Sequence, residues 1–339
     1  MKRIEFVAKN IAEIRETPMV SPLNNDVVVR MHYTAISAGT EYANLTGHSS
    51  VSGIRGKTTP DFPRVSGYSG SGIVEEVGSS VTDLKPGERV VTYWGKHQQY
   101  NTLPRRNIVR IPSADITMDE AALVFISTFS LSAIRKTKPE LGESCLVVGL
   151  GLLGQFSIQF ARLNGTLPII AADTQHERRI LALKNGADAV FNPTEEDYDE
   201  QVRSLTNGKG ANIAIEATGN SSALSDTLQC CAKFARVALL GCSRDPTTVD
   251  FYHDVHYPGI TLIGAHTHAR PMYESYPGNW SHADDCTAVL YYLMSGRLSF
   301  RNMISEVHSP MDAQSVYNRL VYERDFPIGV LFDWSCLAD

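Results

Sequence analysis

The chain has 339 residues, of which 43% are hydrophobic and 20% charged, a composition typical of a folded globular protein long enough for two domains. Its formal net charge of −6 gives no electrostatic case for binding nucleic acid or an anionic membrane. No apolar run approaches the roughly 20 residues that a bilayer-spanning helix needs, and the N-terminus lacks a signal-peptide core, so we expect a cytoplasmic protein.

The first part of the chain, to about residue 110, is rich in predicted strands. An apolar-alternating run covers Asp26–Ala35, and further strands are expected over 72–77 and Arg89–Tyr93. The turn signals Gly78-Ser79-Ser80 and Lys85-Pro86-Gly87 separate them. A helix is predicted over 118–136, next to a domain junction.

From Cys145 to about Leu262, predicted strands alternate with predicted helices, which indicates a parallel sheet covered by helices. Two helices and a last strand follow. The predicted elements are 144–148, 155–164, 168–172, 180–185, 189–191, 195–206, 211–216, 222–231, 236–240, 261–264, 284–295, 311–322 and 328–332.

A glycine-rich motif, Gly149-Leu150-Gly151-Leu152-Leu153-Gly154, directly follows the strand predicted over 144–148. The first glycine permits a tight turn, the second leaves no side chain between the backbone and a pyrophosphate, and the third lets the next helix pack closely. The N-terminus of that helix offers unpaired N–H groups to the phosphates. The motif in this context predicts a dinucleotide site.

Asp173 ends the next predicted strand, 19 residues after Gly154. A carboxylate accepts hydrogen bonds from the adenosine ribose hydroxyls and repels a 2′-phosphate, so Asp173 favours NAD over NADP. Arg178 and Arg179 could accommodate NADP, or they are solvated residues of the next helix. We expect the cofactor to be bound by Gly149, Gly151, Leu152, Leu153, Gly154, Asp173, Thr174, Arg178, Ala217, Thr218 and Gly241.

The six cysteines form no CxxC pair. We therefore expect free thiols rather than disulfides or a cysteine zinc site. Cys145 and Cys242 lie in apolar, strand-like runs and are expected to be buried.

Several short motifs, in this order, resemble those of the medium-chain dehydrogenase/reductase superfamily, which includes zinc alcohol and polyol dehydrogenases and metal-free relatives. The resemblance covers nearly the whole chain. It implies a β-rich GroES-like catalytic domain over 1–127, completed by 263–339, a doubly wound parallel Rossmann sheet over 128–262, and a homodimer. The motifs are 36–41, 62–72, 77–78, 85–90, the turn at 149–154, and 216–219.

The chain departs from the zinc members of this family at the ligand positions. Ala38 stands where a cysteine ligand is expected, and Tyr68 where a histidine ligand is expected. The third ligand should lie in 124–127, which contains no Cys, His or acidic residue, and the lobe with four closely spaced cysteines is absent after Val91. Because alanine and tyrosine do not replace cysteine and histidine as ligands, we expect no catalytic and no structural zinc.

One group of histidines comprises His253, His256, His266 and His268. The spacing of the first two leaves a metal site open. The alternative is that all four surround the loop that joins the two domains. The resemblance then suggests a substrate-contacting or structural role for His266 or His268.

Hydride transfer without zinc still needs a group that takes or gives the hydroxyl proton. Thr40 resembles the family's Ser/Thr that bonds the substrate hydroxyl, and His48 is of a residue type that titrates near neutral pH. Tyr68 is our first hypothesis. The alternatives are that Tyr68 only fills the volume that zinc left and that His48 is a loop residue.

A phenol of pKa about 10 needs a nearby cation to act as a base. The sequence offers Lys57, Lys96 and His97. The substrate pocket is expected to include Glu41, Trp94, His97 and His266, although Glu41 could instead orient neighbouring polar groups.

The loop 270–282 adds a mixed aromatic and polar set: Arg270, Tyr273, Tyr276, Trp280 and His282. Such a wall suits a hydroxylated ring or a sugar-like substrate, unless the loop is an interface or a lid.

These observations predict an NAD-dependent, zinc-independent oxidoreductase acting on a secondary alcohol or ketone of a polyol, cyclitol or sugar derivative. A quinone or enoyl reductase and a non-catalytic NAD(H)-binding protein are the alternatives. The form of the motif 36–41 is similar to that of bacteriochlorophyllide-type dehydrogenases, which leaves a tetrapyrrole substrate open.

Overall fold

The computed structural model describes residues 1–48, 61–243 and 245–337. The chain folds into two compact units: unit 1 is Met1–Ile126 with Cys286–Asp339, and unit 2 is Ser127–Asp285. The first boundary lies one residue from the expected one. The second lies later than expected, because residues 263–285 belong to unit 2. No helix of the described residues is long and apolar enough to cross a membrane.

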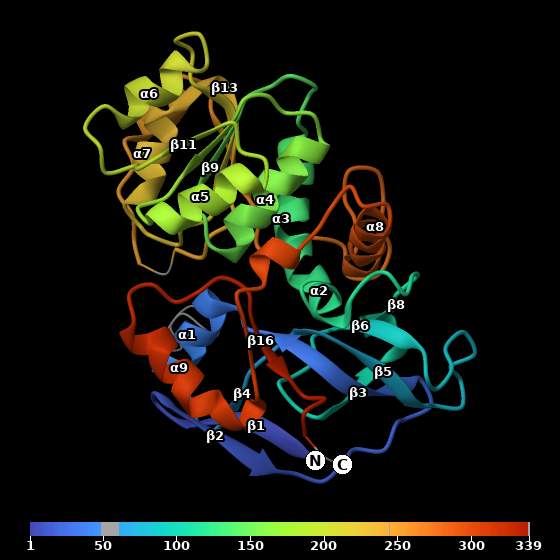
Figure 1. The fold of residues 1–339 in the computed structure, drawn as a ribbon. Helices are drawn as coiled ribbons and strands as arrows, with labels where there is room; N and C mark the ends of the chain where they lie inside the picture. Colours follow the sequence, from blue (N-terminus) through green and yellow to red (C-terminus); the bar gives the residue numbers. More distant parts are fainter. Residues whose placement is uncertain (49–60, 244, 338–339) are drawn as a thin grey trace. The chain divides into compact units, whose positions relative to one another are not determined.

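Unit 1 is built on a seven-stranded sheet with the order β15-β16-β3-β5-β6-β8, and β7 also pairs with β3 (Figure 1). A smaller sheet has the order β2-β1-β4. The strands are β1 (Lys2–Ala8), β2 (Ile11–Glu16), β3 (Asp26–Ala35), β4 (Arg64–Val65), β5 (Ser69–Val77), β6 (Arg89–Tyr93), β7 (Tyr100–Pro104), β8 (Ile108–Arg110), β15 (Glu306–His308) and β16 (Val330–Asp333).

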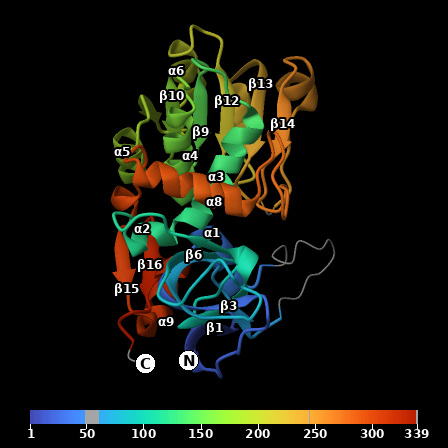
Figure 2. The ribbon, with the colours of Figure 1, turned by 90° about the vertical axis from the view of Figure 1, so that its right-hand side faces the viewer.

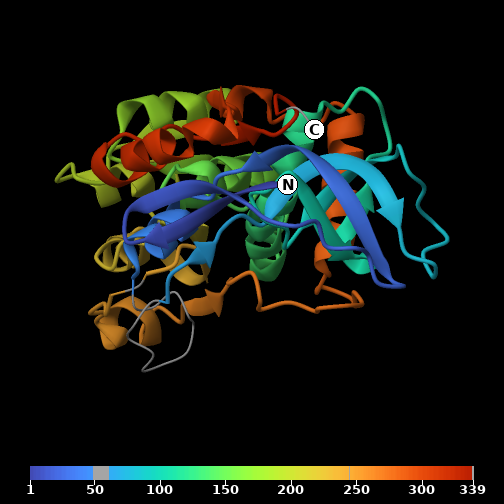
Figure 3. The same ribbon diagram turned by 90° about the horizontal axis from the view of Figure 1, so that it is seen from below.

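The core of unit 1 follows the alternation of β3, in which Val27, Val29 and Met31 point inward. Tyr317 and Phe332 pack into the same core. Seen from below, the N-terminal strands and the red C-terminal helix α9 lie side by side (Figure 3). The helices with residues in unit 1 are α1 (Ala38–Thr46), α2 (Met118–Ala122), α3 (Val124–Thr137), α8 (His282–Met294) and α9 (Ala313–Tyr322).

Unit 2 holds a six-stranded parallel sheet with the order β11-β10-β9-β12-β13-β14, of which Figure 2 shows β10, β9, β12, β13 and β14 side by side. All residues of β9 and β10 are buried, as in a parallel sheet covered on both faces. The order reverses at β9, and ligands of such sheets bind beyond the carboxyl ends at that point. Its strands are β9 (Cys145–Val148), β10 (Ile169–Ala172), β11 (Ala189–Phe191), β12 (Ala211–Glu216), β13 (Cys231–Leu239) and β14 (Thr261–Gly264).

The helices between these strands are α4 (Leu152–Leu163), α5 (His176–Lys184), α6 (Tyr198–Ser204) and α7 (Ala223–Gln229). The α/β fold is therefore the one expected, with differences in detail. The helix predicted over 118–136 is divided at Leu123 into α2 and α3. The strand predicted over 236–240 begins earlier, at Cys231.

All six cysteines are free thiols. Cys145 is buried, as expected, and Cys230, Cys231 and Cys286 are buried too. The expectation of burial is wrong for Cys242, which is exposed because β13 ends at Leu239 and Cys242 lies in the loop that follows.

Candidate nucleotide and substrate sites

The glycine turn joins β9 to α4, and its first and third glycines are required by the protein's own packing. Gly149 has a φ of 87°, and a Cβ on it would lie 2.8 Å from the backbone nitrogen of Thr218. A Cβ on Gly154 would lie 1.9 Å from the carbonyl oxygen of Gly149. Neither position can hold a larger residue without a shift of the backbone.

Gly151 is different. It is the N-cap of α4 with a φ of −66°, which any residue can adopt. A Cβ built on it would meet no atom of the described residues within 4 Å. The missing side chain therefore has no explanation within unit 2, but it leaves the backbone open at the N-terminus of α4. An N-terminus of this kind, continued by Leu152 and Leu153, binds phosphate groups.

Asp173 follows β10, is only 8% exposed and is tied to the glycine turn. Its Oδ2 accepts the N–H of Leu150 at 2.7 Å, and its Oδ1 accepts the N–H of Gln175 at 2.8 Å. Each carboxylate oxygen has two lone pairs, so each can accept a further hydrogen bond from a ribose hydroxyl.

Arg178 and Arg179, the first-turn residues of α5, both bind around Asp173. A guanidinium nitrogen of Arg178 lies 3.8 Å from Oδ2 of Asp173. Arg179 donates to the backbone carbonyls of Asp173 and Thr174, at 2.7 and 3.0 Å. Both arginines lie on the next helix and are half-buried beside Asp173, so neither of the two interpretations is decided by their place.

The carboxyl end of β12 packs directly against the turn. Glu216 is 3% exposed, and its Oε1 accepts the backbone N–H of Thr218 at 2.7 Å. Burial raises the pKa of Glu216. A Cβ on Gly241 would lie 2.5 Å from the nitrogen of Gly219 and 2.9 Å from the carbonyl carbon of Ala217. The structure thus gathers the predicted cofactor residues at one edge of the sheet.

In unit 1, Tyr68 belongs to a cluster of aromatic rings. Its ring centre lies 5.9 Å from those of Trp94 and of Phe125, and the Trp94 and Phe125 rings are 5.1 Å apart. The backbone N–H of Trp94 donates to the carbonyl of Tyr68 at 2.9 Å. Phe125 belongs to the segment where a third zinc ligand was expected. The Tyr68 ring, at one expected ligand position, therefore packs against a ring of the segment where another was expected.

The other candidates for proton transfer lie on or next to α1. Thr40 is partly exposed in its first turn, and His48 follows the helix, with its backbone N–H donating to the carbonyl of Ala43 at 2.9 Å. Ala38 is the first residue of α1 and packs against the core. Of the candidate cations, Lys96 is exposed, and Lys57 lies outside the described residues.

Glu41 and His97, which we expected in the substrate pocket, are fully buried, an arrangement that suits the alternative in which Glu41 orients neighbouring polar groups. Nε2 of His97 lies 3.1 Å from Oε1 of Glu41, and Nδ1 lies 2.7 Å from Oγ1 of Thr34. The hydroxyl of Tyr317 donates to Oε2 of Glu41 at 2.5 Å. Sequence reasoning missed Thr34 and Tyr317, because nothing local connects positions so far apart in the chain.

The expected histidine group does not gather in one place. His266 and His268 are exposed, with ring centres 5.3 Å apart. His253 and His256 lie in a separate exposed turn, where His253 bonds Asp250 at 2.8 Å. Over residues 1–48, 61–243 and 245–337, no group of three or more His, Cys, Asp and Glu side chains is arranged to hold a metal ion. The absence of zinc stays a prediction.

The loop 270–282 is anchored on unit 2 itself. Arg270 donates to Asp285 at 3.0 Å and to the carbonyl of Thr128 at 2.7 Å. Trp280 stacks under the guanidinium of Arg135, 3.9 Å from the ring centre. Burial lowers the pKa of His282 to about 3. Tyr273, Tyr276 and Trp280 are the exposed members of the expected substrate wall.

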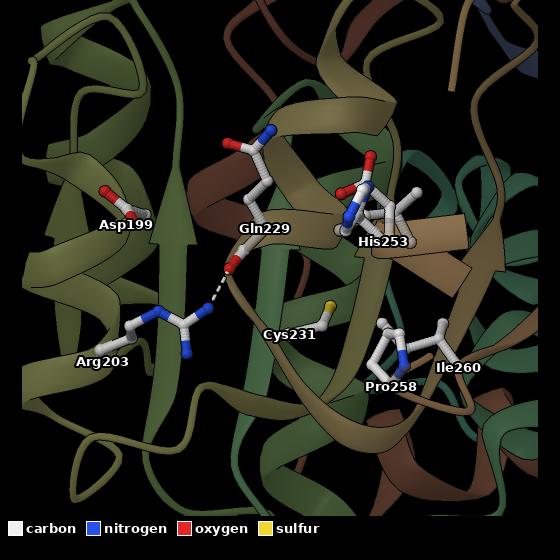
Figure 4. A pocket seen from close by; sticks show the side chains of 9 residues that line it. Asp199, Arg203, Gln229, Cys231, His253, Pro258 and Ile260 are labelled. Atoms are coloured by element: carbon white, nitrogen blue, oxygen red, sulfur yellow. Dashed lines mark hydrogen bonds between the residues drawn. The ribbon is translucent and has the colours of Figure 1, made fainter. Parts of the chain in front are cut away.

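A separate cavity of about 280 Å³ in unit 2 is mixed in charge (Figure 4). The guanidinium of Arg203, which donates to the carbonyl of Gln229, lines the cavity together with the carboxylates of Asp199 and Asp254. The charges that line the cavity therefore favour neither an anion nor a cation. The lining residues are Asp199, Arg203, Leu228, Gln229, Cys231, His253, Asp254, Pro258 and Ile260.

Comparison with known families and proteins identifies both parts of the chain. Residues 24–113 match the alcohol dehydrogenase GroES-like domain, and residues 153–282 match the zinc-binding dehydrogenase family. The chain belongs to the medium-chain dehydrogenase/reductase superfamily.

Relatives from this superfamily match most of the chain. D-guloside 3-dehydrogenase of Escherichia coli is 25% identical over 98% of this chain and 100% of its own length. Sorbitol dehydrogenase of Bacillus subtilis is 25% identical over 92% of each. L-threonine 3-dehydrogenase of Pyrococcus horikoshii is 30% identical, but over 64% of this chain and 59% of its own length.

Solved structures of the superfamily show the same fold. Galactitol-1-phosphate dehydrogenase from Escherichia coli superposes with a TM-score of 0.83, at 19% identity, over 98% of this chain and 100% of its own. The GroES-like match includes Ala38 and Tyr68, so the two departures from the ligand pattern of zinc members stand within a matched domain.

Proposed function

We propose that this protein is an NAD-dependent oxidoreductase that transfers hydride between the nicotinamide and a secondary alcohol or the matching ketone. The observation that carries the proposal is the open backbone at Gly151 with Asp173 bonded to the same turn. The turn and the N-terminus of α4 would hold the pyrophosphate, and Asp173 the adenosine ribose. When bound, the cofactor supplies the hydride acceptor or donor.

The choice of NAD over NADP rests on Asp173. The fold admits both, since one neighbour was solved with NADH and another, from Sinorhizobium meliloti, with NADP. The carboxylate of Asp173 is held in place by two backbone N–H groups, and it repels a 2′-phosphate at the ribose. The positive charge of Arg178, 3.8 Å from Oδ2 of Asp173, is partly neutralised by the carboxylate and is therefore less available to a 2′-phosphate.

We propose a polyol, cyclitol or sugar derivative as substrate. Relatives that match nearly the full chain are named for a guloside and for sorbitol. In unit 1, the half-buried rings of Tyr68 and Trp94 offer an aromatic surface, and the hydroxyls of Tyr68 and Thr40 can bond a substrate hydroxyl. The exposed His266 is the remaining candidate for a substrate contact.

We propose that the reaction does not use zinc. Ala38 offers no ligand atom, and the Tyr68 ring at the expected histidine position packs against Phe125 of segment 124–127. In ketone reduction the hydroxyl of Tyr68 would give its proton to the substrate oxygen and become tyrosinate, and in alcohol oxidation the tyrosinate would take the proton of the substrate hydroxyl, with His48 as the alternative.

The experiment combines cofactor titration with a substrate panel. NADH and NADPH are titrated by fluorescence, and turnover of polyols, cyclitols and sugars is followed by NADH absorbance with and without a chelator. We expect NADH to bind more tightly and turnover to survive chelation. Preference for NADPH would favour a quinone or enoyl reductase. Tight NADH binding without turnover would favour a non-catalytic protein, and loss of turnover restored by added zinc would contradict the metal-free mechanism.

We also propose a homodimer. β14 is an edge strand of the unit 2 sheet, and an edge strand presents backbone groups that a second copy can pair with. Sedimentation equilibrium distinguishes a dimer from a monomer directly.

A further inference from the structure

A row of buried polar side chains runs through the core of unit 1, and its donors can be counted. Nε1 of Trp334 can only donate, so Oγ1 of Thr34 accepts its proton at 2.8 Å. Thr34 has one proton of its own, which it can give to Nδ1 of His97 at 2.7 Å. Oε1 of Glu41 can only accept, so Nε2 of His97, 3.1 Å away, is the donor of that bond.

The row ends on the carboxylate of Glu41, which collects donors from several elements. Besides His97, it accepts the N–H of Ser37 at 2.9 Å and the hydroxyl of Tyr317 at 2.5 Å. Burial, followed by the charge of Glu41, raises the pKa of Tyr317 well above its usual value, so this phenol keeps its proton. Both ring nitrogens of His97 therefore have a bonding partner, Thr34 on one side and Glu41 on the other, which leaves the ring a single orientation.

The His97 ring lies directly against the residue before Tyr68. A Cβ built on Gly67 would lie 2.6 Å from the backbone nitrogen of His97 and 2.9 Å from two carbons of its ring. Gly67 has a φ of +96°, and the N–H of His97 donates to the carbonyl of Ser66 at 2.9 Å. The turn that carries Tyr68 thus takes its shape around His97.

We propose that Glu41 and His97 are positioning residues for Tyr68. By fixing the His97 ring, Glu41 sets the Gly67 turn and with it the place of the Tyr68 phenol. The inference rests on the proposed function, in which Tyr68 handles the substrate proton. It gives the two buried residues a role in the reaction without contact to the substrate.

The test uses Glu41→Gln. Both oxygens of the Glu41 carboxylate accept hydrogen bonds, whereas the amide of glutamine places an NH₂ group opposite one of these donors. We expect kcat to fall by about 100-fold, the cost of a displacement of about 1 Å at a reacting group, with the dissociation constant of NADH unchanged. In a Tyr68→Phe background the same substitution should lower kcat little further, because both act through one phenol. Additive losses would show a merely structural role and overturn the proposal.

The matched control is Tyr322→Phe. It removes a tyrosine hydroxyl from α9, the helix that also carries Tyr317, at a position that is 72% exposed. It should leave kcat unchanged. If Glu41→Gln does not fold, Tyr317→Phe removes one donor to the same carboxylate without adding an N–H group. The same double-mutant cycle with Tyr68→Phe then applies, with a smaller expected loss of kcat.

A second readout does not need activity. The chain has three tryptophans, and the Trp94 ring lies 5.9 Å from the Tyr68 ring, so its indole N–H resonance reports the place of that ring. We expect Glu41→Gln to shift the indole signals of both Trp94 and Trp334, and Tyr322→Phe to shift neither. An unchanged Trp94 signal would overturn the proposal. If the wild type turns over no substrate, the proposed function fails, and this readout still decides the positioning.

Discussion

Asp173→Asn tests the two roles we give to the Asp173 carboxylate, which are to hold the glycine turn in place and to bind the adenosine ribose. Its oxygens accept the N–H groups of Leu150 and Gln175 at 2.7 and 2.8 Å. In the amide, one oxygen becomes an NH₂ group that faces a donor, so one bond is lost and the other weakened. Hydrogen bonds to a charged group are worth about 1.5–3 kcal/mol each, so we expect the free energy of unfolding to fall by about 2–4 kcal/mol.

The same substitution changes the preference between cofactors. Loss of a charged acceptor for the ribose hydroxyls should weaken NADH binding by about 10- to 100-fold. NADPH should lose less, because the repulsion of its 2′-phosphate disappears and Arg178, now 3.8 Å from Oδ2, no longer faces a negative charge. Fluorescence titration with both cofactors and thermal unfolding measure the two effects.

Asp188→Asn is the matched control, because Oδ2 of Asp188 accepts the N–H of Ile169 at 2.7 Å at the opposite end of β10. Asp188 is exposed, so we expect a small loss of stability and an unchanged ratio of NADH to NADPH affinity. A wild-type ratio in Asp173→Asn, or an equal change in both variants, would refute the role assigned to Asp173.

Three further outcomes follow from the same geometry. Gly151→Ala should cost under about 1 kcal/mol of stability but weaken NADH more than tenfold, whereas Gly154→Ala should cost about 1–3 kcal/mol or more because its Cβ meets a backbone oxygen. Unfolding curves and NADH titrations check the pair, and equal stabilities would argue against it. Tyr68→Phe should lower turnover by about 100-fold or more with NADH binding unchanged, and full activity by steady-state kinetics would remove Tyr68 from the mechanism. Alkylation followed by mass spectrometry should label the exposed Cys242 and Cys336, and NADH should protect Cys242 only, since it lies beside Gly241, which we propose to bind the cofactor; equal labelling with and without NADH would contradict that proposal.

The fold of unit 2 and its glycine turn could be predicted from the sequence because the motifs that indicate them are local. The glycine turn, the strand before it and Asp173 lie within one βαβ unit, so their order in the chain fixes their proximity. The structure adds the bond between Asp173 and Leu150, for which the motif offers no indication.

Features that depend on distant residues could not be predicted in the same way. The pair of Glu41 and His97 looked like a pocket wall, because the sequence does not show that Thr34 and Tyr317 bury and satisfy it. The start of β13 was missed because its register against β12 is irregular near Ala211 and Phe234 has a φ of 62°, which breaks the alternation. The sequence also does not show that Arg270 bonds the carbonyl of Thr128 and that Asp285 bonds Arg135, two contacts that join residues 263–285 to unit 2.

The interruption of unit 1 by unit 2 fixes the order in which a ribosome can complete them. Unit 2 is one continuous stretch, so all of its strands have been synthesised once Asp285 has been added. Unit 1 cannot be completed until the C-terminal residues have been synthesised, because Tyr33–Ala35 of β3 pair with β16 and Glu41 bonds Tyr317. Until then, part of β3 is an open strand edge, which is a template for aggregation. A nascent or truncated chain therefore has the sheet of unit 2 complete while the sheet of unit 1 is still open.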